Sequence, residues 1–534
     1  MAIPVIDIFA GPGGLGEGFS SVKGKRGKRF FDIKLSIEMN KDAHETLELR
    51  SFFRQFPINK VPQDYYELLK ITDLKEWKEC KSNLFSKYKK QGDIAKHEAW
   101  NTTLGKVSNC ELDQRISEHV AKGEKWVLTG GPPCQAYSNI GRARVGGINK
   151  KDKRVYLYKE YLRIIAVHQP AIFIMENVKG LLSAKVGGKK IFKSILKDLK
   201  SPSKVFRKQG VDCPDYRIFS LVKSPESNLF DSDRKTPMYK NDVDFLIRCE
   251  KYGVPQKRHR VILVGVRNDM DITEIPILDA VEEVSLKSII NDLPKLRSGV
   301  SRKVLSTRIG ADGKLKLTYE KIIDSPIVWK ELVTKHARSI IQKNGFSKFK
   351  EKLKIRIPKK GRGSIYLNTN PRYKNNHLRE WYSDDKTVGV CNHETRSHLK
   401  EDLERYFFAS LFVKQYNRFP RLQDYPSELL PHHQNVKSGK FADRFRVQMA
   451  DIPATTVTSH ISKDGHYFIH YDPEQCRSLT VREAARIQTF PDNYYFCGPR
   501  TSQYVQVGNA VPPLLAFKIG KIVKEVIETV EKKK

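Results

Sequence analysis

The chain has 534 residues, 39% of them hydrophobic, which is enough to bury a sizeable core and leaves room for two or three domains. It carries 97 Lys and Arg against 61 Asp and Glu, and the resulting net charge of +36 predicts a polyanionic partner such as nucleic acid. No apolar run is long enough to span a membrane and the eight cysteines form no close CxxC pair, so we expect a soluble, cytosolic protein of a reducing compartment.

Short apolar runs recur through the first half of the chain and predict buried strands. The first, Ile3 to Phe9, passes directly into a glycine-rich turn. Tyr156 to His168 has a helical pattern and lies between two of the later runs. These later strand candidates are Leu35 to Glu38, Trp126 to Thr129, Ile172 to Met175, Tyr216 to Val222 and Arg260 to Val266. The alternation favours an α/β fold with an open, mostly parallel sheet.

The turn after the first run suits a nucleotide-like cofactor. Gly11 to Gly16 satisfies the pattern GxGxxG, and Glu38 follows at the distance expected of a ribose-binding acid. Phe9 adds an aromatic wall beside the turn. A nicotinamide dinucleotide and S-adenosylmethionine both fit this pattern, so the glycines alone do not choose between them, and a plain strand-to-helix turn is the structural alternative.

A candidate nucleophile follows the strand at Trp126 to Thr129. In Pro132-Pro133-Cys134-Gln135 the prolines restrict the backbone and would hold Cys134 at the carboxyl end of a strand. Glu176 ends the strand at Ile172 to Met175, so we expect it at the same edge of the sheet, where ligands bind. Taken singly, Cys134 could be a packed small side chain and Glu176 a helix cap.

A third polar group precedes the last predicted strand. Alternation along a strand places Gln256, Arg258 and Arg260 on one face, where the arginines could hold the carbonyl of a base or a phosphate. A solvated strand edge is the alternative.

These motifs, in this order, resemble the DNA (cytosine-5) methyltransferase family of bacterial and phage type. The likeness continues in Arg482 to Gln488 with Phe490-Pro491, and in Gln506 to Pro513. It implies a Rossmann-like S-adenosylmethionine-dependent methyltransferase domain with an inserted, smaller target-recognition domain. The expected divisions are a catalytic part over 1–268 with an insertion at about 57–125, a recognition part over 269–450, and a C-terminal part over 451–534 that completes the catalytic domain.

The resemblance also implies residue roles. Cys134 would add to carbon 6 of a cytosine extruded from the duplex, Glu176 would act at ring nitrogen 3 and the exocyclic amine, and Arg260 with Arg258 would hold the carbonyl at carbon 2. Cofactor contacts are expected from Phe9, Gly11, Gly13, Gly14, Leu15, Glu38, Pro132, Asn509, Ala510 and Val511. Substrate contacts are expected from Gln135, Ser138, Asn177 and Gln256.

Two features depart from the family pattern or stand outside it. The insertion displaces the Asp-Ile that shorter members use for the adenine amine; Asp73 is out of register, so that contact is left open. The insertion itself is charged and helical in pattern and is expected to be a surface elaboration. Cys391, His393 and His398 could suggest zinc, but a fourth regularly spaced ligand is missing, which favours a polar loop.

The expected partner is double-stranded DNA, with a cognate restriction nuclease or other defence proteins as further candidates, and the expected state is a monomer in the bacterial cytoplasm or nucleoid. Three other hypotheses remain open. The substrate could be structured RNA, the chain could be a nonenzymatic DNA-binding protein with the same fold, or it could be a nicotinamide dehydrogenase. The last gives Pro132 to Gln135 no role.

Overall fold

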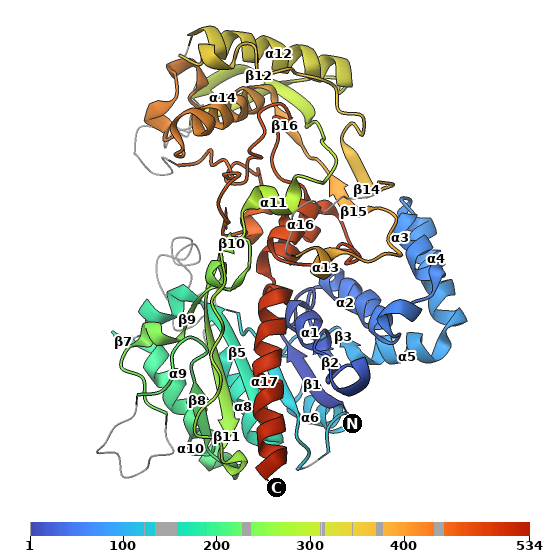
Figure 1. Cartoon of the computed structure of the whole chain (residues 1–534), viewed down its shortest axis with the longest axis vertical. Coiled ribbons are helices and arrows are strands. Elements are labelled where there is room, and N and C mark those ends of the chain that lie inside the picture. The colour runs from blue at the N-terminus through green and yellow to red at the C-terminus, as the bar shows by residue number, and fades with distance from the viewer. Residues whose placement is uncertain are drawn as a thin grey trace.

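The structure is a computed structural model of the whole chain (Figure 1). The residues that it describes are 2–121, 123–133, 157–186, 188–226, 237–309, 311, 315–343, 345–369, 378–431 and 443–533. Cys134, Gln135 and Ser138 therefore lie outside the described residues.

An eight-stranded sheet in the order β3-β2-β1-β4-β5-β11-β8, with β9 also paired to β11, organises the lower part of the molecule in Figure 1. Strands β3, β2, β1, β4 and β5 are mutually parallel, and β11 runs antiparallel to its neighbours. The bounds are β1 Ile3–Ile8, β2 Phe31–Ile37, β3 Ala99–Trp100, β4 Val127–Gly130, β5 Ile172–Val178, β8 Tyr216–Phe219, β9 Leu246–Arg248 and β11 His259–Arg267. The predicted α/β fold with a mostly parallel sheet is confirmed.

Helices cover both faces of this sheet, because its strands are apolar on both sides. On one face α1 (Gly14–Ser20) packs against α17 (Pro513–Lys533), the long C-terminal helix that crosses the front of the sheet in Figure 1. The other face carries α6 (Asn109–Ser117), α8 (Leu157–His168), α9 (Ile191–Lys200) and α10 (Pro202–Phe206). A small hairpin of β6 (Lys185–Val186) and β7 (Lys189–Lys190) precedes α9.

Three helices form an insertion after α2 (Lys41–Arg54). They are α3 (Gln63–Lys70), α4 (Leu74–Lys87) and α5 (Lys89–Glu98), and their aromatic side chains pack against Phe52 of α2. The range 57–125 expected for the insertion contains these three helices, together with β3 and α6, which belong to the sheet and the helix layer on one of its faces. A strand of two residues has no periodicity by which a sequence could reveal it.

The upper part of the molecule in Figure 1 is a second unit with a core of its own. Strands β12 (Gly299–Ile309), β13 (Leu315–Lys321) and β16 (Ser397–Leu399) form one sheet, flanked by α12 (Pro326–Lys343) and α14 (Lys400–Tyr416). Strands β14 (Gly363–Leu367) and β15 (Val390–Glu394) form a separate pair. Within the described residues, no helix is long and apolar enough to cross a membrane.

Between the two units lie short elements from distant parts of the sequence (Figure 1). They are α11 (Leu286–Ile290), α13 (Arg379–Tyr382), α15 (Val481–Ile487), α16 (Arg500–Asn509) and the parallel pair β10 (Gln256–Lys257) and β17 (Ala454–Thr455). All of them except β10 contribute to one apolar cluster, which includes Leu286, Ala484 and Tyr504.

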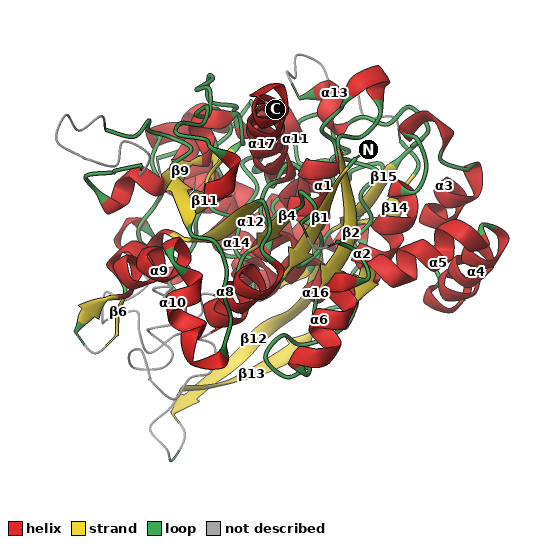
Figure 2. Ribbon diagram, turned by 90° about the horizontal axis from the view of Figure 1, so that it is seen from below, coloured by secondary structure: helices red, strands yellow, loops and turns green. Residues whose placement is uncertain are grey.

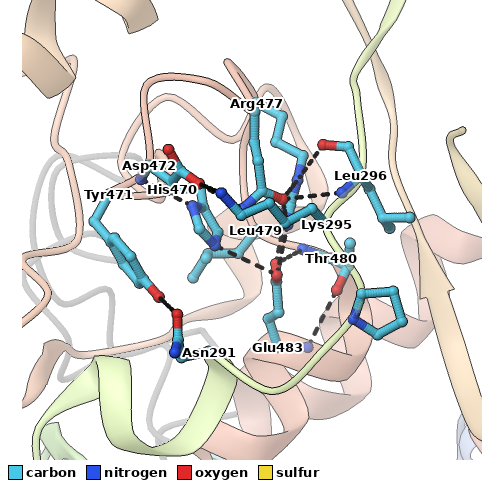
Figure 3. A network of polar contacts seen from close by, with 12 residues as sticks. Asn291, Lys295, Leu296, His470, Tyr471, Asp472, Arg477, Leu479, Thr480 and Glu483 are labelled. Atoms are coloured by element: carbon cyan, nitrogen blue, oxygen red, sulfur yellow. Dashed lines mark hydrogen bonds and ion pairs between the residues drawn. The ribbon is translucent and has the colours of Figure 1, made fainter. Parts of the chain in front are cut away.

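A buried polar network fastens this junction (Figure 3). Both terminal nitrogens of Arg477 donate to the Glu483 carboxylate at 2.7 Å, and Nη2 also donates to Gln475. Burial alone would raise the pKa of Glu483, but the adjacent Arg477 lowers it well below its usual range. Lys295 pairs with Asp472 at 3.0 Å on the exposed side. Because a buried charge that loses its partner is costly, the network favours this one arrangement of the two units.

Candidate active site

The carboxyl ends of four parallel strands meet at one edge of the sheet. Ile8 of β1 is in register with Ile37 of β2 and with Gly130 of β4, and Ile37 is in register with Trp100 of β3. The residues that follow these strands therefore line one edge, which is where ligands bind in open α/β sheets. They are Phe9, Glu38, Asn101 and Gly131.

The glycine turn after β1 has a backbone that side chains rarely tolerate. Phe9, Gly11 and Gly13 have φ values of 56°, 58° and 92°. A Cβ on Gly13 would lie 2.7 Å from Leu47, and a Cβ on Gly14 would lie 2.1 Å from the carbonyl oxygen of Val511. The turn thus needs its glycines, and the chain before α17 closes directly against it. Such strain is typical of a ligand-binding loop.

Glu38 faces the same turn. One oxygen of its carboxylate accepts from the backbone N–H of Gly11 at 2.8 Å and the other accepts from that of Asn40 at 2.7 Å. Burial raises the pKa of Glu38. Each carboxylate oxygen keeps a second lone pair, so the group can also accept from the hydroxyls of a ribose.

Asn101 was missed by the sequence reasoning. It follows β3 directly, is exposed, and its Nδ2 donates to the backbone oxygen of Glu38 at 2.8 Å. It therefore lies at the edge where the contact to an adenine amine was left open. The one sequence feature that marks this position is the apolar pair Ala99-Trp100, which follows a long helical stretch. Two residues are too few to predict a strand unless the partner strand is known.

The remaining residues predicted to bind the cofactor differ in their exposure. Leu15 is 4% exposed and packs into the apolar cluster under α17, so only its backbone is free to meet a ligand. Asn509 is exposed at the end of α16, whereas Ala510 and Val511 are buried. Pro132 is buried as well.

Glu176 and Arg260 form a pair at the neighbouring strand ends. Arg260 Nε lies 2.7 Å from Glu176 Oε1, and both side chains are about one-tenth exposed. The N–H does not point along this contact, so it is a close charge contact rather than an aligned hydrogen bond. A Cβ on Gly131 would lie 2.8 Å from Glu176 Oε2, so glycine leaves the room that this carboxylate occupies.

Asn177 ties the start of the Pro-Pro-Cys turn to β5. Its Nδ2 donates to the carbonyl of Pro132 at 3.2 Å, and its Oδ1 accepts from the N–H of Val178 at 2.9 Å. The side chain is 4% exposed. Its amide therefore positions the backbone that leads into Cys134.

Gln256, Arg258 and Arg260 are all buried, whereas Lys257 is exposed and His259 is half-buried, and this alternation fits the predicted shared face although the strand is interrupted at Arg258, between β10 and β11. The terminal nitrogens of Arg258 donate to backbone oxygens of the C-terminal segment, at 2.7 Å for Val457 and 2.8 Å for Ala510.

Gln256 is fully buried and donates to the carbonyl of Ile487 at 3.0 Å. Gln256 and Arg258 therefore fasten the chain that closes on the glycine turn, and only Arg260 of the three is beside Glu176.

The Cys391, His393 and His398 motif is not a polar loop, and that expectation was wrong. Cys391 and His393 belong to β15 and His398 to β16, and all three are buried. His393 contacts Thr480 Oγ1 and the carbonyl of Pro294. Among the described side chains no group of three or more His, Cys, Asp and Glu is arranged to hold a metal ion. His393 thus joins β15 to the junction, whereas His398 contacts the hydroxyls of Tyr406 and Ser478.

The comparisons with known proteins agree with this geometry. The sequence profile of the family described as C-5 cytosine-specific DNA methylase matches residues 81–203 and 237–525. The type II methyltransferase M.Bpa9945I of Bacillus paralicheniformis is 32% identical over 98% of this chain and 99% of its own length. The DNA (cytosine-5-)-methyltransferase M.ApeKI of Aeropyrum pernix is 27% identical over 80% of this chain and 87% of its own.

Among solved structures, a DNA modification methyltransferase encoded within an Escherichia coli prophage has the same fold, with a TM-score of 0.51 and 18% identity over 99% of this chain and 100% of that chain. The glycine turn, the Glu-Asn pair at the end of β5 and the C-terminal closure thus occur in a chain that the family profile matches over most of its length and that aligns with a type II methyltransferase over 98% of its residues. The chain belongs to the C-5 cytosine-specific DNA methylase family and is a DNA cytosine-5 methyltransferase.

Proposed function

We propose that the chain methylates carbon 5 of cytosine at one short motif in double-stranded DNA, with S-adenosylmethionine as methyl donor and Cys134 as nucleophile. The contact of Glu176 with the strand end that leads into Cys134 carries this proposal. Gly131 leaves room for the carboxylate, and Asn177 binds Pro132. Cys134 follows Pro132 by two residues, so their Cα atoms are at most about 7 Å apart.

The residues at the sheet edge fit S-adenosylmethionine. Gly13 and Gly14 form a cradle that a Cβ would fill, Glu38 offers acceptors for ribose hydroxyls, and Asn101 is exposed beside it with an amide that can meet an adenine edge. The bound cofactor would supply an electrophilic methyl group on a sulfonium. A dinucleotide would satisfy the glycines and Glu38 equally, but it would leave Cys134 and Glu176 without a task.

In the proposed reaction the Cys134 thiolate bonds to carbon 6 of the extruded cytosine. Glu176 hydrogen-bonds or protonates ring nitrogen 3, which stabilises the charge that develops, and Arg260 holds the carbonyl oxygen at carbon 2. Carbon 5 then takes the methyl group, loses its proton to a base, and the sulfur–carbon 6 bond breaks to release 5-methylcytosine. Arg258 stabilises the backbone beside this site by donating to the carbonyls of Val457 and Ala510.

We place this activity in a restriction-modification or anti-phage defence system of the bacterial cytoplasm, because the relatives named above include a type II methyltransferase. In such a system methylation protects the host motif from a cognate nuclease. The segment 269–450 would hold the target-recognition domain, and the chain would act as a monomer.

The test uses the purified full-length chain with tritiated S-adenosylmethionine and either genomic DNA or transfer RNA, followed by bisulfite mapping. We expect label in DNA, at cytosines of one motif, and no label with Cys134→Ser, which should still bind cofactor and DNA. Turnover by Cys134→Ser would remove Cys134 from the mechanism. Label in RNA alone would replace DNA by RNA as the substrate.

A further inference from the structure

The hairpin β12–β13 is a two-stranded ribbon that leaves the body of the second unit. Strand β16 pairs with β12 only at Gly299, Val300 and Arg302, and among the described residues the rest of β12 pairs with β13 alone. Figure 2 shows the ribbon extending past the neighbouring helices. From Arg302 to Ile309 it spans roughly 25 Å. An isolated two-stranded ribbon is only marginally stable in water, and its free edges can pair with other chains. A ribbon of this length is therefore expected to bind a partner.

The two faces of this ribbon differ in chemistry. Register pairs Lys303 with Glu320, Ser306 with Thr318 and Arg308 with Lys316, and alternation puts all six side chains on one polar face. The opposite face begins at the base of the ribbon with Arg302 and Lys321, where Arg302 lies over the Tyr319 ring, and continues toward the tip with Val304, Thr307, Ile309 and Leu317. Leu305 is the extra residue of a bulge where the register shifts.

The polar face is cationic and exposed. Its one acid, Glu320, is paired with Lys303 at 3.0 Å. Arg308 and Lys316 face each other across the ribbon as like charges, and both are exposed. Like charges opposite each other destabilise a hairpin, so this pair favours an anion that lies between or against them. Next to them the hydroxyls of Ser306 and Thr318 are 2.6 Å apart, and each can also bond to an outside group.

We infer that the polar face of β12–β13 enters the major groove of the target duplex and reads base edges, with Arg308 as the principal reader and Lys316 beside it. The major groove is about 12 Å wide and admits a two-stranded ribbon. Arginine binds the O6 and N7 acceptors of guanine through two donors, and serine and threonine hydroxyls accept or donate to any base. This inference rests on the proposed function, because it assigns the specificity of the same reaction.

The test compares charge-matched variants of the full chain. Arg308→Ala with Lys316→Ala alters the ribbon. Lys330→Ala with Lys335→Ala removes the same charge from exposed positions of α12, where these lysines line a surface groove of about 580 Å³. Each protein is given S-adenosylmethionine and genomic DNA and mapped by bisulfite sequencing. Cofactor binding and thermal unfolding verify that each is folded.

We expect the ribbon variant to lose roughly 5- to 150-fold in the rate at the wild-type motif and to accept other bases at a guanine position. The α12 variant should keep the wild-type motif. Arg308→Lys keeps the charge but not the bidentate geometry, so it should bind nonspecific DNA normally and still relax the motif.

An unchanged motif and rate in the ribbon variant would overturn the inference, as would equal losses in the two double variants, because the effect would then be charge alone. A wild-type dimer in sedimentation that the ribbon variant abolishes would overturn it too, since the ribbon would then serve self-association. Wild-type protein that labels no DNA would overturn the proposed function, and this inference with it.

Discussion

Asp7 is fully buried in β1, and its carboxyl group contacts Thr129 Oγ1 at 3.0 Å. Burial raises the pKa of Asp7 from 3.8 to about 7. Because this pKa is higher in the folded than in the unfolded chain, the folded state holds a proton that the unfolded state has released between these values. The contribution of Asp7 to stability is therefore complete below about pH 4 and is lost as the pH rises to about 7.

Asp7→Asn should remove this pH dependence, since the amide oxygen can keep the Thr129 contact and carries no charge. Relative to the wild type, we expect the variant to gain about 3 kcal/mol in the free energy of unfolding on going from pH 5 to pH 8. Denaturant unfolding at the two pH values measures this difference. Asp32→Asn, on the half-exposed side of β2, is the control. If wild type and Asp7→Asn differed in free energy of unfolding by the same amount at both pH values, Asp7 would ionise normally.

Glu176 is the other carboxyl group on which a prediction depends. Glu176→Gln should lower the rate of methyl transfer by about 10²- to 10⁴-fold, because the amide cannot deliver a proton to ring nitrogen 3. Its oxygen can still face Arg260, so folding and cofactor binding should be kept. Single-turnover methylation and cofactor titration separate the two effects. A variant of normal rate would rule out Glu176 as the acid.

At the scale of elements, the contact between the glycine turn and the chain before α17 joins the two ends of the sequence. Gly14 is set against the Val511 carbonyl, and Arg258 holds the adjoining backbone. Glu17 of α1 pairs with Arg50 of α2, with Nε 2.8 Å from Oε2, and Arg50 also donates to Asn493. The sheet edge at the glycine turn is thus assembled by segments hundreds of residues apart.

Gly14→Ala and Gly16→Ala form a matched pair for this contact. The new Cβ at Gly14 would lie 2.1 Å from a backbone oxygen, whereas at Gly16 the nearest atom would be 3.6 Å away. We expect Gly14→Ala to lose about 1–3 kcal/mol of stability and to weaken cofactor binding, because the backbone must shift. Gly16→Ala should be neutral or gain up to about 1 kcal/mol. Thermal unfolding with and without cofactor tests both; equal behaviour would mean that the closure tolerates a side chain.

At the scale of the whole molecule, the charge of +36 is spread along the chain, and both units contribute to it. Binding to a nonspecific duplex should therefore release many counterions. For six to ten phosphate contacts we expect the affinity to fall by about 10³- to 10⁵-fold between 50 and 200 mM salt. Fluorescence titration of a labelled duplex at several salt concentrations gives the slope. An affinity independent of salt would mean that the charge serves another partner.

The sequence by itself determined the central strands, the glycine turn and the candidates Cys134 and Glu176. Such features are local: apolar runs, glycines and prolines restrict the backbone within a few residues of themselves. The order of the motifs then indicated the family, because each motif can be recognised separately along the chain.

Only the tertiary structure decided which of these residues meet. β3 becomes visible through its pairing with β2, and Asn101 becomes a candidate through that strand. Arg258 is identical in type to Arg260, yet Arg258 donates to the distant carbonyl of Val457 while Arg260 lies beside Glu176. Burial and partner choice depend on segments far away in the chain, and no local pattern contains them.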